Sequence, residues 1–218
     1  MGPSFAFAIV LLSAGFASAN PIISVTGTHD TAFFVGGSAA DEMLVSSWTE
    51  TGSYINVSIS AVLSNQFGGN PNSTLSAYLT DRIGPGTTAA DVIASTSISP
   101  TTFDETDTLF TGLSLGAGSY YLVLAAPGKF AGWWGTNSPT ITTDTGVTDT
   151  GYYYTNLQGN GSPDDAFPPA STFSPDTTDF LLYSATGTAS SATPEPSSFI
   201  LAGLAGIFLF SVKSRLPR

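Results

Sequence analysis

The stretch Ile55-Asn56-Val57-Ser58-Ile59-Ser60-Ala61 decides the fold class of this chain. Apolar and polar residues alternate along it with a period of two, and Leu63 continues the apolar series. Successive side chains of a β-strand point to opposite faces of a sheet, so this alternation gives one buried row and one exposed row. The stretch is therefore predicted to be a half-buried β-strand.

Similar short runs recur on both sides of this stretch, separated by turn residues such as Gly84-Pro85-Gly86. No segment between residues 20 and 188 has a helical period free of Gly, Thr and Pro, which disfavours a parallel sheet with crossover helices. We therefore predict an all-β domain over 20–188, an antiparallel, jelly-roll-like β-sandwich. Its other strands are expected at Ile22–Thr28, Ala32–Val35, Met43–Thr49, Leu75–Thr80, Val92–Ile98, Thr108–Thr111, Ser119–Ala125, Gly151–Thr155 and Phe180–Thr188.

Two of these strands carry a more specific expectation. In Leu115–Leu124, glycines permit a tight entry, and Tyr121 and Val123 face one way while their neighbours face the other. Both faces are apolar, so this strand is predicted to be central. The final strand is expected to pair near the first, which would bring both ends of the domain together.

Charge and cysteine content exclude several function classes. The net charge is −11, and the only bases between Asn20 and Thr193 are Arg82 and Lys129. A nucleic-acid partner is therefore not expected, because binding a phosphate backbone requires clustered Lys and Arg. The chain has no cysteine, which removes thiol nucleophiles and Cys-type zinc or iron–sulfur sites.

The N-terminus has the organisation of a signal peptide. An apolar run from Phe5 to Phe16 precedes Ala17-Ser18-Ala19, a small-x-small pattern that signal peptidase cleaves. Residues 1–19 are therefore predicted to form a signal helix that is removed, leaving Asn20 as the mature N-terminus. The alternative is a buried core helix, but the run shows no amphipathic face.

The C-terminus has a second ordered set of features. A linker at 189–193 leads to Pro194-Glu195-Pro196 and then to an apolar run from Phe199 to Val212. The prolines favour an extended segment that a processing enzyme can bind, and the run predicts a hydrophobic helix that enters a membrane. Basic residues that halt translocation follow it: Lys213, Arg215 and Arg218.

Residues 194–218 resemble the PEP-CTERM sorting signal in three features: the Pro194-Glu195-Pro196 triad, the Gly/Ala/Leu-rich run around Leu201–Gly206, and the basic terminus. The resemblance implies recognition by an exosortase, a membrane-embedded transpeptidase, after a transient stay in the inner membrane. It further implies delivery to the cell surface or the extracellular matrix of a Gram-negative, biofilm-forming bacterium. A plain membrane anchor is the alternative.

Two motifs of hydrolases are present but lack their context. Gly112–Gly116 matches the G-x-S-x-G nucleophile elbow, yet a strand is predicted after it and the only histidine, His29, precedes Ser114. Asp144-Thr145-Gly146 and Asp149-Thr150-Gly151 match an aspartic-protease triplet, but they are too close together to supply two lobes. Turn chemistry is the preferred explanation of both triplets, and no catalytic residue is predicted.

Acidic clusters are interpreted as solvated loops, with Ca²⁺ as a weaker alternative and no other cofactor expected. The densest cluster is Asp104, Glu105 and Asp107, followed by Asp41-Glu42 and Asp164-Asp165. Fifteen acidic residues precede Glu195 in the mature region, so some carboxylate pairs are inevitable and a glycosidase is not inferred from them.

Aromatic residues give the stronger prediction of a binding site. Flat, exposed rings stack on sugars, and core packing is the alternative for any of them. The predicted glycan-binding residues are Trp133, Trp134, Tyr152, Tyr153 and Tyr154, with Phe130 beside them, whereas Trp48 and Phe33-Phe34 are assigned to the core.

Together, these features predict a non-enzymatic surface or extracellular-matrix protein, with signal peptidase and an exosortase as processing partners. A carbohydrate-binding module that contacts extracellular polysaccharide is the alternative, and a secreted hydrolase is the remote one.

Overall fold

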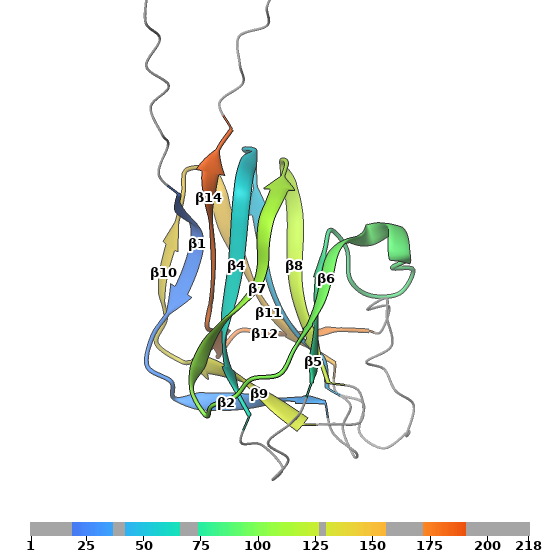
Figure 1. The fold of residues 1–218 in the computed structure, drawn as a ribbon, viewed down its shortest axis with the longest axis vertical. Coiled ribbons are helices and arrows are strands. Elements are labelled where there is room, and N and C mark those ends of the chain that lie inside the picture. The colour runs from blue at the N-terminus through green and yellow to red at the C-terminus, as the bar shows by residue number, and fades with distance from the viewer. Residues whose placement is uncertain (1–18, 37–41, 66–73, 127–129, 156–171, 191–218) are drawn as a thin grey trace, which may run out of the picture.

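The computed structural model describes residues 19–36, 42–65, 74–126, 130–155 and 172–190. They form two antiparallel sheets around one main core, which confirms the predicted all-β class (Figure 1). The predicted terminal helices lie outside these residues, as do the acids Asp41, Asp164 and Asp165. No helix within the described ranges has the length and apolar character needed to cross a membrane.

The larger sheet has eight strands and is built around β4 (Tyr54–Ser64). This long strand pairs with three others, because its first part lies between two neighbours and its end reaches a third. The remaining strands of this sheet are β1 (Asn20–Thr26), β2 (Thr31–Gly36), β7 (Glu105–Leu115), β9 (Phe130–Thr136), β10 (Thr140–Thr143), β13 (Phe180–Leu181) and β14 (Tyr183–Ala189).

The smaller sheet has six strands in the order β12-β11-β3-β8-β5-β6. A 3-10 turn, η1 (Ala89–Asp91), leads into its edge strand β6. Its strands are β3 (Leu44–Glu50), β5 (Leu75–Thr80), β6 (Val92–Ile98), β8 (Gly118–Ala125), β11 (Val147–Tyr154) and β12 (Ser174–Asp176).

Both ends of the domain leave the sandwich at the same place. β1 pairs antiparallel with β14, so Asn20 lies opposite Gly187, as the sequence predicted. We call this end the chain-end pole. β2 and β9 run crosswise at the opposite end, which we call the far pole (Figure 1).

The prediction that β8 is central is confirmed, because β3 pairs along one side of it and β5 along the other. Tyr120, Leu122 and Leu124 lie in the main core between the sheets. Val123 lies in a second apolar cluster on the outer face of the six-stranded sheet, and Tyr121 packs against that cluster. The strand is therefore apolar on both faces.

The alternation that predicted β4 breaks at one residue. Asn56 has a φ of 53°, and the register between β4 and β7 shifts between Tyr54 and Val57. This bulge inserts an extra residue, so Ile55 is exposed while Val57 and Ile59 are buried. The prediction that Ile55 shares the inward face was therefore wrong.

Three strands were not predicted: β9, β10 and β12. Two glycines interrupt β9, and Gly135 shows why they are needed there. A Cβ on Gly135 would lie 2.5 Å from the Phe33 ring and 3.0 Å from the Phe180 carbonyl oxygen. Glycine therefore permits the close approach of β2 and β13 to β9, although it hides the strand in the sequence.

Of the three aromatic residues that the sequence assigned to the core, the structure confirms Trp48 and Phe33. Trp48 is fully buried, and its ring stacks on Tyr120 with centroids 5.6 Å apart. Phe33 packs against the main core, but the next residue, Phe34, is exposed. Adjacent residues of a strand point to opposite faces, so Phe33 and Phe34 cannot both face the same core, and the assignment of Phe34 was wrong.

Candidate functional site

The tryptophans predicted to bind glycans are packed inside the protein. Trp133 is 0% exposed, and its indole N–H donates to the Leu182 carbonyl oxygen at 2.9 Å. Trp134 is 8% exposed, and its N–H donates to the Phe103 carbonyl oxygen at 3.0 Å. Neither ring offers a free flat face to a sugar. This placement agrees with the core-packing alternative for both residues.

The three predicted tyrosines divide between the two faces of β11. Tyr152 is buried, with its ring 5.5 Å from that of Phe33. Tyr154 is half-buried and packs against the same core, whereas the half-buried Tyr153 lies on the outer face of the sheet. The five predicted residues therefore do not form one exposed platform. The side chain of Phe130 lies outside the described part of the chain.

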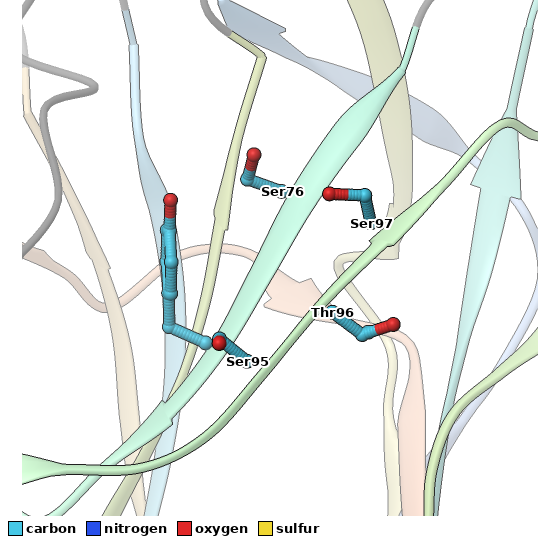
Figure 2. A pocket seen from close by; sticks show the side chains of 5 residues that line it. Ser76, Ser95, Thr96 and Ser97 are labelled. Atoms are coloured by element: carbon cyan, nitrogen blue, oxygen red, sulfur yellow. The ribbon is translucent and has the colours of Figure 1, made fainter.

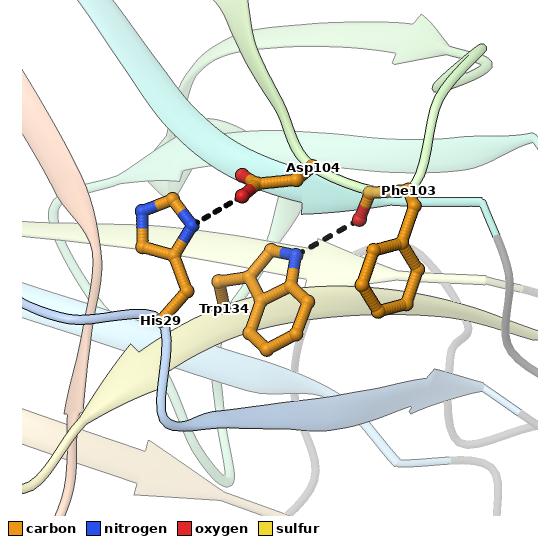
Figure 3. Close-up of polar contacts among 4 residues, drawn as sticks. All are labelled: His29, Phe103, Asp104 and Trp134. Carbon is orange, nitrogen blue, oxygen red and sulfur yellow. Dashed lines mark hydrogen bonds and ion pairs between the residues drawn. The ribbon is translucent and has the colours of Figure 1, made fainter.

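A different group of side chains meets at the far pole. We call His29, Phe103, Asp104 and Trp134 the far-pole cluster (Figure 3). His29 stacks on Trp134 with ring centroids 5.7 Å apart, and its Nδ1 lies 2.7 Å from Asp104 Oδ2. On the other side of the indole, the Phe103 ring stands edge-on at 5.1 Å. The cluster thus joins loops that are 75 residues apart in the chain.

The loop that carries His29 is fixed to β9. The Asp30 N–H donates to the Gly135 carbonyl oxygen at 3.1 Å, and Thr136 Oγ1 donates to Asp30 Oδ2 at 2.8 Å. Hydrogen bonds from the hydroxyls of Thr28 and Thr136 lower the pKa of Asp30, so this carboxylate stays ionised. Its role is to hold the loop beside Trp134.

The loop that carries Phe103 and Asp104 is held by Glu105. One oxygen of this carboxylate accepts the backbone N–H groups of Thr101 and Thr102 at 3.0 and 3.1 Å, and it also accepts their hydroxyls. These bonds, led by the Thr101 N–H, lower the pKa of Glu105. Phe103 and Asp104, which lie between these two bonded threonines and β7, are thereby held at a defined position.

The far-pole cluster offers both an apolar surface and hydrogen-bonding groups. Phe103 is 44% exposed, whereas the indole beneath it is almost covered. Asp104 and His29 are partly exposed on the opposite side of the indole from the Phe103 ring (Figure 3). A ligand could contact the ring while its polar groups bond to the carboxylate and the imidazole. Exposed aromatic and polar groups on anchored loops are typical of binding sites.

Sequence reasoning did not single out Phe103. An aromatic residue between two predicted strands, next to the densest acidic cluster, is the pattern that would have found it. The contact with His29 has no counterpart in the sequence, because it depends on how the two loops meet across β9.

A second hollow lies on the outer face of the six-stranded sheet, at β5 and β6 (Figure 2). It has a volume of about 430 Å³ and is lined by hydroxyls. Among its described lining residues, Tyr78 is the one that is aromatic, but it is buried and so presents no open stacking face. The hollow is therefore a weaker candidate for ligand binding than the far-pole cluster. Its lining residues are Ser76, Tyr78, Ser95, Thr96 and Ser97.

The hydrolase-like motifs have other roles in the structure. Ser114 lies on β7 rather than on a strand-to-helix turn, and it is nine residues from the start of that strand at Glu105. Since each strand residue advances about 3.3 Å, Ser114 is roughly 30 Å from the His29–Asp104 pair. Ser114 therefore cannot act with His29 in this structure.

The two Asp-Thr-Gly triplets also serve the backbone. Asp144 accepts the Thr145 N–H at 2.7 Å in the turn between β10 and β11, and Gly146 has a φ of 80°. The second triplet forms a bulge within β11 instead of a turn, because the register shifts between Asp149 and Gly151. Turn chemistry thus explains the first triplet, and a bulge explains the second.

The acidic residues predicted as one cluster point to separate partners. Asp104 contacts His29, Glu105 closes its own loop, and Asp107 is half-buried with a pKa raised to about 6 by burial. Burial also raises the pKa of Glu42 to about 7. Within the described ranges, no three His, Asp or Glu side chains are close enough to hold a metal ion together.

Of the predicted processing sites, only Ala19 and Asn20 are described, and both are exposed. Ala17, the Pro194-Glu195-Pro196 motif and the basic residues Lys213, Arg215 and Arg218 lie outside the described part. In comparisons with known proteins, the chain matches no protein-family model and no curated protein.

Proposed function

We propose that this protein is an exported, non-enzymatic component of the cell surface or extracellular matrix. Its jelly-roll-like sandwich is delivered through the signal peptide at 1–19. The PEP-CTERM-like tail at 194–218 holds it in the inner membrane through an apolar helix until an exosortase cleaves near Pro194-Glu195-Pro196.

The observation that best supports this proposal is the position of the two ends of the domain. Asn20 pairs with Gly187, and Ala189 pairs with Tyr54, so the described domain begins and ends at the chain-end pole. From Ala189, the last paired residue, the chain can span at most roughly 17 Å to Pro194, which keeps the tethered domain close to the membrane. The far pole then faces away from the tether. Such an arrangement suits a protein that displays one end to its surroundings.

The experiment that tests the sorting route is the mass of the protein released from the cell surface. We expect a mature chain that begins at Asn20 and ends near the triad. Replacing Pro194 and Pro196 with Ala should retain the unprocessed chain in the membrane. Pro175→Ala, a substitution at an exposed proline of β12, is the matched control. A released chain that still ends at Arg218 would exclude exosortase cleavage.

Carbohydrate binding is the second candidate function, and one observation favours it. Phe103 exposes an aromatic ring, and the Asp104 carboxylate and the His29 imidazole are partly exposed across the Trp134 indole from it. A polysaccharide can stack one sugar ring on the phenyl group while the hydroxyls of a neighbouring sugar donate to Asp104. The proposed ligand is a neutral extracellular polysaccharide, because the strongly acidic chain would repel an anionic one.

A glycan array, followed by affinity electrophoresis in the selected polysaccharide, tests this second function. Phe103→Ala should weaken retention at least tenfold, since aromatic stacking is lost while the loop stays anchored by Glu105. Ile141→Ala is the control, because Ile141 is another exposed apolar side chain, on β10. Equal retention of both variants would place the binding elsewhere. Trp133 and Trp134 are poor probes, because their removal would disturb the core.

A further inference from the structure

The edge strands of the two sheets differ in how well they are protected. A strand at the edge of a sheet has unpaired N–H and C=O groups, and proteins block such edges with short strands, proline, charges or bulges. β13 has two residues, β12 has three with Pro175 among them, and β10 has four. None of these three strands is long enough to give another chain an extended row of backbone N–H and C=O groups to pair with.

The two longer edges of the eight-stranded sheet are blocked in other ways. β7 carries Glu105 and Asp107, and its register with β4 shifts three times. The end of β2 is already engaged, because the Gly36 N–H donates to the Glu42 carbonyl oxygen at 2.8 Å. Acidic residues also flank β2 at Asp30 and Glu42.

Beyond one register shift at its start, between Val92 and Ala94, β6 lacks these protections. Its residues Ala94 to Ile98 pair with β5 in unbroken register, and the segment from Val92 to Pro100 contains no charged residue. Among the described residues, no strand other than β5 pairs with β6. Apart from that ladder, no hydrogen bond joins Ala94–Ile98 to another described residue. The outer side of the β6 ladder is thus open within the described part of the chain.

The side chains of β6 also leave the core incompletely covered at this edge. Ala94 and Ile98 pack against the main core but are only half-buried, and Thr96 between them is half-buried too. Ser95 and Ser97 point to the outer face and are exposed (Figure 2). Another strand beside β6 would shield the inward row from water and satisfy the open ladder.

We propose that β6 is a self-association edge, at which a second copy of this chain adds its own β6 antiparallel across a two-fold axis at Thr96. In this register Thr96 lies opposite Thr96, Ala94 opposite Ile98, and Ser95 opposite Ser97. Inward residues then face inward residues, and the central pair is a Thr–Thr pair, which is favourable across strands. The two six-stranded sheets become one continuous sheet.

Charge explains why a second copy fits this edge. Two chains of net charge −11 repel each other, so they can approach only where few acids meet. The nearest acid before β6 is Asp91, whose carboxylate accepts the Thr88 N–H and hydroxyl. In the proposed register the two Asp91 residues lie at opposite ends of the ladder, roughly 33 Å apart, well beyond the Debye length.

Sedimentation of the full chain over a range of concentrations tests this proposal. We expect a dimer that dissociates on dilution. Thr96→Glu places two carboxylates directly opposite each other and should raise the dissociation constant at least tenfold. Thr111→Glu adds the same charge at an exposed position on β7 and should leave the dimer intact. Mixing Thr96→Glu with Thr96→Lys should restore dimers, which a misfolded variant would not do.

Cysteine cross-linking fixes the register, because the chain has no native cysteine. Opposed residues on neighbouring strands are close enough for a disulfide, so Thr96→Cys should give a covalent dimer when dissolved oxygen accepts the two thiol electrons. Thr111→Cys should not. The proposal is overturned if the wild type sediments as one chain at every concentration. It is also overturned if Thr96→Glu associates like the wild type, as it would if the apolar chain ends caused association.

Discussion

At the chain-end pole, Trp48 donates its indole N–H to Glu50 at 3.1 Å, and only 3% of Glu50 is exposed. At the far pole, Trp134 donates to a backbone carbonyl instead, and the nearby carboxylate of Asp104 is partly exposed beside His29. Both poles thus combine a tryptophan with a carboxylate. They differ in whether the carboxylate can reach water or a ligand.

This difference separates a structural site from a binding site. Burial raises the pKa of Glu50 to about 7, and its second oxygen is buried without a hydrogen-bond partner among the described residues. Nearby, the Tyr54 hydroxyl donates to Asp144 at 3.1 Å, closing the same pole. The chain-end pole therefore uses its polar groups for packing, whereas the far pole leaves them accessible.

The largest difference in the free energy of unfolding should be between alanine variants of two aromatic residues near the far pole. Trp133→Ala should lower the free energy of unfolding by about 3–5 kcal/mol, because it removes a fully buried indole and its hydrogen bond to Leu182. Phe103→Ala should cost less than about 1 kcal/mol, because much of that ring is already in water. Urea unfolding of both variants measures the difference. Equal losses would mean that the Phe103 ring is part of the core.

The fold could be predicted from the sequence where one face of a strand is buried and the ladder is regular. The bounds of β5 and β6 were predicted as they occur, because each run of strand residues is bounded by turn residues. β9 was missed because its glycines are needed for contacts with β2 and β13, which are distant in the chain. Local patterns cannot reveal such a close approach.

The candidate site was harder to predict than the fold. Trp133 and Phe103 are both aromatic, and the sequence does not show that one is buried between β2 and β4 while the other lies on a loop. Composition identified an aromatic-rich region, but burial assigned its members to different roles. The position of His29 beside Asp104 required the crossing of two loops over β9.

The next largest effect on stability should come from the ionisation of Glu50, which depends on pH. The folded pKa of about 7 exceeds the ordinary pKa of 4.5 for a Glu side chain, so the folded state retains a proton that the unfolded state releases between these values. Stability from this group is therefore present below pH 4.5 and is lost as the pH rises towards 7. Glu50→Gln removes the ionisation. It should stabilise the protein at pH 8 by up to roughly 3 kcal/mol, with little change at pH 4.5.

Urea unfolding of the wild type and Glu50→Gln at both pH values checks this prediction. Glu42 and Asp107 also have raised pKa values, so both proteins should retain some loss of stability with rising pH. The difference between the two proteins isolates Glu50. If Glu50→Gln were less stable than the wild type at pH 8, the ionised carboxylate would stabilise the fold rather than destabilise it through burial.

The smallest effect on stability should come from the same type of substitution, a carboxylate replaced by its amide, at the far pole. Asp104→Asn keeps the shape of the side chain but removes the charge facing His29. Exposed ion pairs contribute little, so the expected loss of stability is below about 1 kcal/mol, opposite in sign to the effect of Glu50→Gln at pH 8. A loss above about 2 kcal/mol would show that the His29–Asp104 pair holds the two loops together. The far pole would then be a structural site like the chain-end pole, and carbohydrate binding there would lose its physical basis.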